Sequence, residues 1–232
     1  MIEAGRDPAT SRLDNFVDAA FAFALTLLVI AGAERGFDYA ELIDSMRRIP
    51  AFIVGSALIG LFWFAHVGWR RAGGRNGALS VVLSLALVLT VLVYVHPMRL
   101  MAAAFVDFLG DGEVRQGFSP RGLFTIYGLG FGTMAALVWG LYARARSTGA
   151  LAPADVDVPV IWALMAAAGM LSALLAQFDS TMLFAPWIYT LLSVAVPLAL
   201  SLRRRGRASA ANGRQPKVSG SRGRGSGRRP RS

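Results

Sequence analysis

The stretch SRLDNFVDAAFAFALTLLVI, residues 11–30, combines a charged start, an acid within apolar sequence and an uninterrupted apolar run. Ionisable groups at membrane depth are costly, so Asp18 in this run is a candidate functional residue. Ser11 and Asp14, three residues apart, fit a capping box, which predicts that a helix starts there. With 3.6 residues per turn, five side chains share one stripe, which is the candidate working surface. They are Phe16, Phe23, Leu27, Ile30 and Glu34.

The composition of the whole chain is that of a polytopic membrane protein. Of its 232 residues, 55% are hydrophobic and 16% are charged, which is too apolar for a water-soluble domain. The chain has no cysteine, and this excludes disulfides and thiolate chemistry. Its net charge of +10 comes mainly from arginines after Leu202 and in short loops. This distribution fits membrane topology and argues against nucleic-acid binding.

Six apolar stretches are long enough to cross a bilayer, which requires about 20 helical residues. We therefore expect an all-α, multi-pass protein of the cell membrane, with the lipid bilayer as its main partner. The expected spans are Leu13 to Ala33, Ala51 to Trp69, Ala78 to Met98, Leu123 to Tyr142, Val158 to Ala176 and Met182 to Leu202.

The two ends of the chain are expected on the cytoplasmic side. Arginines follow the second, fourth and sixth spans, and the positive-inside rule places such residues in the cytoplasm. Residues 1–202 are the expected six-helix domain, and residues 203–232 form an Arg/Gly/Ser-rich tail whose composition predicts disorder. The tail either contacts anionic lipids or is a solvated topology anchor.

Two ionisable residues are expected at similar depths in neighbouring spans. Asp18 lies six positions after Arg12, and His66 lies four positions before Arg70. With a helical rise of about 1.5 Å per residue, Asp18 and His66 can meet. Their contact is either structural or a proton relay, and a relay makes a small proton-coupled secondary transporter the alternative function.

Three other patterns have possible functional interpretations. Haem ligation by His66 and His96 is disfavoured because their expected depths differ. The segment TIYGLGFG, residues 125–132, has the wrong order for a potassium-filter loop, and Gly128 and Gly132 instead suit close helix packing. The sequence has no Walker loop, HExxH or GxSxG motif, so we expect no enzyme and no cofactor. A non-conducting scaffold with a partner-recruiting tail is a third functional class.

Three short motifs occur together in the first half of the chain. They are Arg12, Phe16 and Asp18 of a signature Arg-x-x-x-Phe-Ser-Asp, Trp63 and His66 of a Trp-x-x-His pattern, and Arg70, Arg71 and Asn76 around a basic turn. Over residues 11 to 100 the chain resembles the Transmembrane Protein 175 family of potassium channels, in its short prokaryotic six-span form.

The resemblance implies a homotetrameric, potassium-permeable channel without a re-entrant filter loop, in which the first helix of each subunit lines the pore. Phe23, Leu27 and Ile30 are implied to form the constriction, and Thr26 to contribute to selectivity for the permeant monovalent cation. The implied network that keeps the first two helices in register consists of Arg12, Phe16, Asp18, Trp63 and His66.

Two positions depart from the family pattern, and one residue extends the site. Val17 replaces the signature serine, which removes a hydroxyl that we expect near the inner mouth. Phe23 replaces a smaller aliphatic residue, so the constriction is expected to be tighter. Glu34, one turn beyond Ile30, is expected to form an acidic outer vestibule that concentrates cations.

Overall fold

The computed structural model describes residues 8–30, 39, 46, 49–75, 77–110, 119–181, 184 and 187–212. All regular elements in these ranges are helices, as expected. They are α1 (Pro8–Ile30), α3 (Ile49–Arg71), α4 (Ala78–Gly110), α5 (Pro120–Ser147), the 3-10 helix η1 (Pro153–Asp155), α6 (Val158–Leu175) and α7 (Trp187–Asn212).

Five segments of the described chain are long and apolar enough to cross a membrane. They are Ser11–Ile30, Ile49–Arg71, Ala78–Ala104, Arg121–Ser147 and Pro153–Leu175. The chain is therefore a multi-pass membrane protein. The sixth expected span, Met182 to Leu202, overlaps α7, which is not one of these five, so the count of six stays a prediction.

The end of the chain differs from the expected division at Leu202. Helix α7 continues to Asn212, and Pro197 lies inside it. The chain separates at this proline into two compact units, Met1–Val196 and Pro197–Ser232. Residues 213–232, which make up most of the expected tail, lie outside the described residues.

Helix α1 begins at Pro8, so the capping box predicted at Ser11 is wrong. Proline suits the first turn of a helix because the N–H group that it lacks would have no partner there. Ser11 is an exposed residue within the helix. Asp14 does not cap the helix, because its carboxylate pairs with Arg70 of α3.

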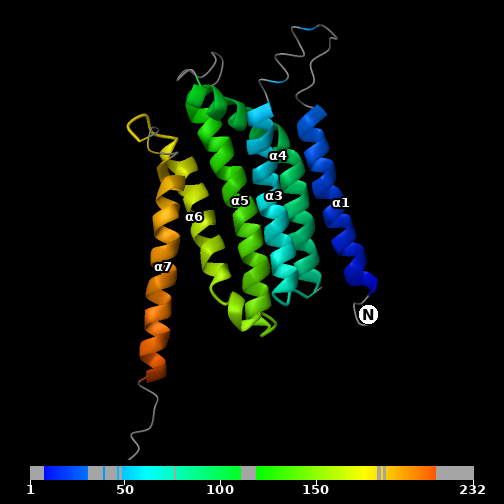
Figure 1. Cartoon of the computed structure of the whole chain (residues 1–232), viewed down its shortest axis with the longest axis vertical. Helices are drawn as coiled ribbons and strands as arrows, with labels where there is room; N and C mark the ends of the chain where they lie inside the picture. The colour runs from blue at the N-terminus through cyan, green and yellow to red at the C-terminus, as the bar shows by residue number, and fades with distance from the viewer. Residues whose placement is uncertain are drawn as a thin grey trace, which may run out of the picture. The chain divides into compact units, whose positions relative to one another are not determined.

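The five long helices of the first unit pack side by side around an apolar core. Helix α1 lies against α3 and α4, α5 lies against the same two helices, and α6 lies against α5 (Figure 1). Phe62 of α3 is fully buried, and its ring centroid lies 5.6 Å from that of Phe131 on α5 and 5.9 Å from that of Trp162 on α6. Aromatic contacts at these distances add specific packing to the apolar burial.

Glycines allow α5 and α6 to approach very closely. A Cβ atom added to Gly169 of α6 would lie 2.6 Å from the Cα atom of Gly132, and one added to Gly128 would lie 2.8 Å from the carbonyl oxygen of Gly169. Small residues at such a contact let two membrane helices pack backbone to backbone. The packing interpretation of residues 125–132 is confirmed, because this segment lies within continuous helix α5.

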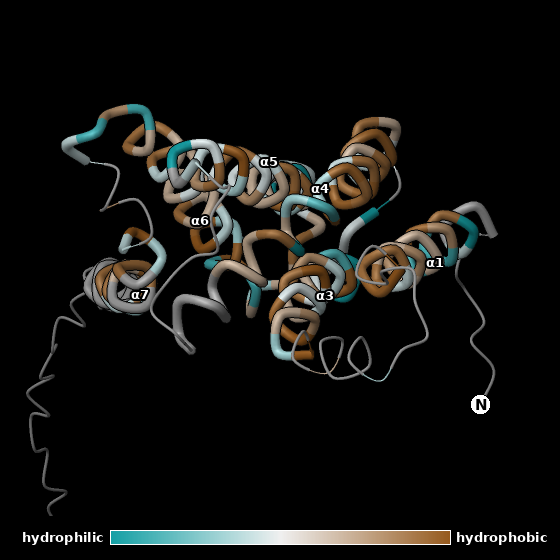
Figure 2. Tube along the Cα trace, turned by 90° about the horizontal axis from the view of Figure 1, so that it is seen from above, coloured by the Kyte–Doolittle hydropathy of each residue, from teal (hydrophilic) through white to brown (hydrophobic). Residues whose placement is uncertain are grey.

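The surface of the helices is apolar around most of their circumference. Large exposed apolar side chains occur on every long helix, for example Phe64 of α3, Leu89 of α4 and Leu174 of α6. Figure 2 shows brown, apolar residues on outward as well as inward faces. This pattern is typical of helices that are solvated by lipid.

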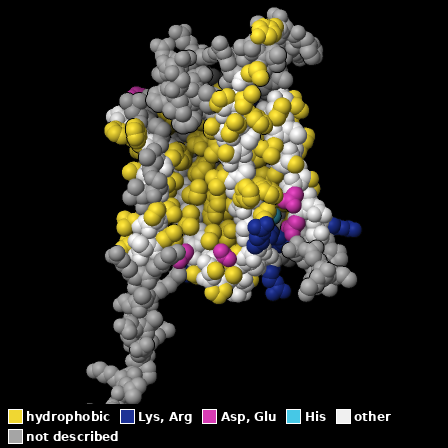
Figure 3. Space-filling model, viewed as in Figure 1, with side chains coloured by type: hydrophobic (Ala, Val, Ile, Leu, Met, Phe, Trp, Pro, Cys, Tyr) yellow, Lys and Arg dark blue, Asp and Glu magenta, His cyan; other side chains and the backbone are white. Residues whose placement is uncertain are grey.

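The turns that follow α3 and α5 meet at one end of the bundle. The backbone N–H of Ala152 donates a hydrogen bond of 2.8 Å to the carbonyl of Ala72. Gly73 has a φ of 104°, and a Cβ atom there would lie 2.0 Å from the carbonyl oxygen of Ala150. We call this the basic end, because exposed arginines flank the two turns, at Arg71, Arg75, Arg144 and Arg146. In Figure 3 most described charged side chains lie toward one end of the face shown, and its middle is apolar.

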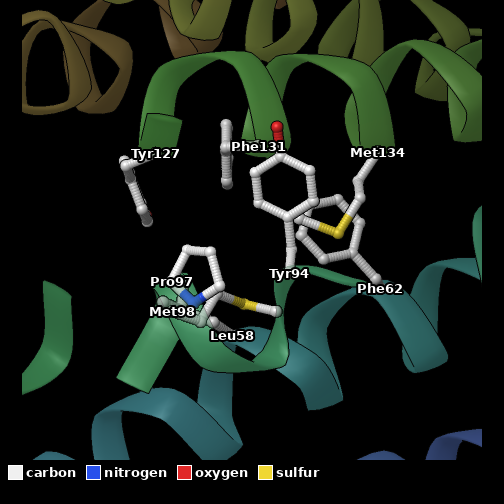
Figure 4. Close-up of a pocket in the computed structure, with 8 residues that line it drawn as sticks. All are labelled: Leu58, Phe62, Tyr94, Pro97, Met98, Tyr127, Phe131 and Met134. Atoms are coloured by element: carbon white, nitrogen blue, oxygen red, sulfur yellow. The ribbon is translucent and has the colours of Figure 1, made fainter. Parts of the chain in front are cut away.

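Helices α3, α4 and α5 leave a small apolar gap between them (Figure 4). It is lined by Leu58 and Phe62 of α3, by Tyr94, Pro97 and Met98 of α4, and by Tyr127, Phe131 and Met134 of α5. The gap has no room for a water molecule. It is therefore a dry part of the apolar core.

Candidate functional site

One stripe of α1 attaches this helix to the rest of the chain. Val17, Phe21, Ala24 and Leu28 are all buried in the main apolar core. Their spacing of four, three and four residues places them on one face of a helix. This face packs against α3 and α4, and Leu28 fits over Gly55 of α3. On the opposite side of α1, several side chains are exposed with respect to the part of the chain that the structure describes.

The predicted pore residues lie on one of these outer faces. Phe23 is 55% exposed and Ile30 is 64% exposed, whereas Leu27 is half-buried at the margin of the core. Phe23 and Leu27 each precede a buried residue by one position, which corresponds to about 100° around the helix. Apart from Leu27, this apolar stripe of a candidate membrane span has no packing partner in the described part of its own chain. Phe16, 54% exposed, extends it toward the start of α1.

Thr26 is exposed beside this stripe. Its hydroxyl donates a hydrogen bond of 2.7 Å to the carbonyl oxygen of Phe23, one turn earlier in the same helix. The hydroxyl hydrogen is therefore engaged with the backbone. What Thr26 offers to its surroundings is the pair of lone pairs on Oγ1, which are the groups that a cation binds.

The polar residues predicted to register the first two helices have different partners from those expected. Trp63 of α3 donates a hydrogen bond of 2.8 Å from Nε1 to Oδ1 of Asp18. His66, which is buried, forms its hydrogen bond with Ser84 of α4, with 3.1 Å between Nε2 and Oγ. The direct contact expected between Asp18 and His66 is therefore not formed. The two spans are still joined at this level, but through the indole.

Two further residues considered in the sequence, Arg12 and His96, are exposed and do not make the contacts considered for them. Arg12 is exposed, and within the described part of the chain it bonds neither Asp18 nor His66. His96 is exposed on α4, twelve positions after Ser84, which is the partner of His66. Twelve residues span about 18 Å along a helix, so the two histidines cannot share one haem iron. Glu34 and Asn76 lie outside the described residues.

Sequence reasoning missed the ion pair between Asp14 and Arg70. The Nε atom of Arg70 lies 2.7 Å from Oδ1 of Asp14, and its Nη2 donates a hydrogen bond of 3.0 Å to Oδ2. Asp14 and Asp18 are four residues apart and thus share a face of α1, while Trp63 and Arg70 are seven apart and share a face of α3. Pairing the two acceptor side chains on α1 with the two donor side chains on α3 would have predicted both contacts.

The known proteins to which this chain is similar are described as potassium channels. Residues 12–106 match the family described as the endosomal/lysosomal potassium channel TMEM175. A protein of Marivirga tractuosa named "Potassium channel" is 30% identical over 105 residues, which are 45% of this chain and 42% of that relative. The chain thus matches less than half of the length of this curated relative.

A solved structure shows the same fold over most of the chain. It is the crystal structure of a variant of the potassium channel MtTMEM175 in complex with a nanobody fusion protein. The TM-score is 0.74 at 23% sequence identity, and the match covers 88% of this chain and 97% of that chain.

Proposed function

We propose that this chain forms a potassium-permeable channel whose pore is lined by α1 of several identical chains, since residues 12–106 match the TMEM175 family. The observation that carries this proposal is the outer stripe of α1. Phe23 and Ile30 are exposed on a helix whose neighbouring stripe is fully buried. A helix fixed on one side and apolar on the other suits a position between its own bundle and a central axis.

The pore lies between chains in this proposal. Each chain supplies α1 once, so several copies are required to surround an axis. The gap between α3, α4 and α5 does not admit water, which favours a path outside the bundle of a single chain. The family resemblance makes the assembly a homotetramer, with its basic end and both termini on the cytoplasmic side of the cell membrane.

The stripe acts as a hydrophobic constriction. A ring of Phe23, Leu27 and Ile30 side chains that is narrow enough to expel water imposes a desolvation barrier on a cation. Widening the ring lets it wet and lowers this barrier. Thr26 places hydroxyl oxygens beside the ring, and Glu34 supplies the acidic outer vestibule.

Potassium flux into liposomes tests the proposal. Replacing Ile30 by Asn should raise the flux roughly tenfold, which corresponds to a desolvation barrier lowered by about 1.4 kcal/mol. Val93→Asn is the matched control, because Val93 is an equally exposed apolar residue on α4. Equal flux for the wild type and Ile30→Asn, or an equal rise in the Val93→Asn control, would contradict the assignment of the stripe.

The same assay separates the channel from the alternative carrier. A carrier that uses Asp18 and His66 as a relay would show saturable flux that requires a proton gradient. In the structure these residues bond Trp63 and Ser84 respectively, so the direct contact on which the relay depended is missing. We therefore expect flux to follow the cation gradient when the pH is equal on both sides.

A further inference from the structure

The ion pair between Asp14 and Arg70 joins the first helix to the second expected span at the basic end. Both carboxylate oxygens of Asp14 face the guanidinium, at 2.7 Å from Nε and 3.0 Å from Nη2. The side chains are only 26% and 11% exposed, respectively. Only the contact from Nη2 to Oδ2 has the geometry of a hydrogen bond, and Nε approaches Oδ1 as an ion-pair contact. A charge-assisted hydrogen bond between two largely buried side chains still constrains their relative position.

Arg70 is itself held firmly in place. Its Nη1 donates a hydrogen bond of 3.1 Å to the carbonyl of Gly74, and its guanidinium lies 5.2 Å from the ring centroid of Trp69, which is buried. The turn that contains Gly74 is bonded to the turn after α5 through Ala72 and Ala152. Arg70, the partner of Asp14, is therefore bonded to one of the two turns that are joined at the basic end.

Asp14 lies on the side of α1 opposite the apolar stripe of Phe23, Leu27 and Ile30. Phe23 follows Asp14 by nine residues and Leu27 follows Asp18 by nine, so each pair lies on opposite sides of the helix, roughly 180° apart. The polar contacts thus hold the back of α1, and the apolar stripe forms its front. A rotation of α1 that breaks the ion pair must turn the front by the same angle.

We propose that Asp14 and Arg70 are the positioning pair that sets the rotation of α1 and with it the direction in which the Phe23, Leu27 and Ile30 side chains point. This role rests on the proposed function in one respect, namely that the Phe23, Leu27 and Ile30 side chains line a pore. The effect of the ion pair on the rotation of α1 can be tested without measuring flux. Asp14 touches no permeating ion in this proposal. It acts through the orientation of the helix.

The absence of cysteine in the chain allows a direct measurement. Ala24→Cys places a single thiol on the buried face of α1, where Ala24 is fully buried and the change in size is small. Its rate of modification by a charged methanethiosulfonate reagent is measured in purified full-length protein. The backgrounds are wild type, Asp14→Asn, Arg70→Gln, and the exchange of Asp14→Arg with Arg70→Asp.

We expect the thiol to be protected in the wild-type background and to react roughly tenfold faster in each single variant, since loss of the anchor raises the population of rotated or open states. The charge exchange should restore protection at least in part. Arg121→Gln is the matched control, because it removes another ion pair, with Asp179, that does not involve α1. It should leave the rate unchanged.

Potassium flux through the same backgrounds, without the cysteine, gives the second readout. Flux should change in Asp14→Asn and return toward the wild-type value in the charge exchange. Should a single variant fail to fold, Asp14→Glu keeps the charge on a longer arm and should give an intermediate rate of modification. Unchanged protection in both single variants, or a charge exchange that behaves like the sum of two losses, overturns the proposal.

The two proposals fail in different ways. If the protein carries no flux but protection follows the ion pair, the anchor stands and the channel falls. If Ile30→Asn raises flux while protection is indifferent to Asp14 and Arg70, the channel stands and the anchor falls.

Discussion

Val17 shows how one side chain differs from its predicted setting. It occupies the serine position of the family signature, and the missing hydroxyl was expected at the inner mouth. The side chain is instead fully buried and belongs to the core that joins α1 to its neighbours. At this site an apolar residue adds to packing, and its effect on the pore surface is indirect.

Replacing Val17 by Ser should therefore destabilise the protein. A buried hydroxyl without a full set of partners costs about 1–3 kcal/mol, and the loss of a methyl group adds to this. Ala19→Ser is the control on the same helix, because Ala19 is exposed and should change stability by less than about 0.5 kcal/mol. Thermal unfolding in detergent measures both. Equal midpoints for the two variants would contradict the burial of Val17.

The polar residues Asp18, Trp63 and His66 could be singled out from the sequence, but most of their partners could not. Sequence depth suggested that Asp18 and His66 can meet, because residues at equal heights on neighbouring helices are candidates for contact. Height leaves the rotation of each helix undetermined, and that rotation directs Asp18 toward Trp63 and His66 toward Ser84. Asp14 was assigned to a helix cap and Arg70 to topology, so their mutual contact was missed.

At the level of helices, hydropathy located the apolar spans better than the helix ends. The third expected span ended at Met98, yet α4 continues through Pro97 to Gly110. The sixth was expected to end at Leu202, yet α7 continues to Asn212. Hydropathy reports what a bilayer covers, whereas a helix ends where its backbone hydrogen bonds end. The close packing of Gly128 and Gly132 was correctly predicted because small residues at this spacing have one common use in membranes.

The close contact between the turns that follow α3 and α5 depends on Gly73. Ala at this position would adopt an unfavourable positive φ and would place its Cβ atom against the carbonyl of Ala150. We expect Gly73→Ala to lower stability by about 2–4 kcal/mol. Gly149→Ala separates the two causes, because Gly149 also has a positive φ of 69° but no atom within 4 Å of an added Cβ.

Gly149→Ala should therefore cost only about 1 kcal/mol, from its backbone conformation alone. Thermal unfolding midpoints of the two variants in one detergent give the comparison. If both midpoints fall equally, the contact between the turns contributes nothing to the stability of the protein.

For the whole molecule, the decisive quantity is the number of chains. The proposed pore requires several copies of α1, and we propose four from the family resemblance. Light scattering of the purified protein in detergent should give a protein mass about four times the 24.8 kDa of one chain. A mass of one chain would contradict a pore formed between subunits, whatever the fold of the subunit.

The glycine contact between α5 and α6 divides the molecule mechanically. Where the two backbones touch, rotation of either helix would bring a Cβ atom against the backbone of the other. These two helices therefore tolerate only one relative register and are expected to move together. In the described part of the chain, α1 meets α3 through side chains, such as Leu28 over Gly55, so this contact can adjust more than the one between α5 and α6. A change of packing in this bundle is therefore expected at α1 before it occurs between α5 and α6.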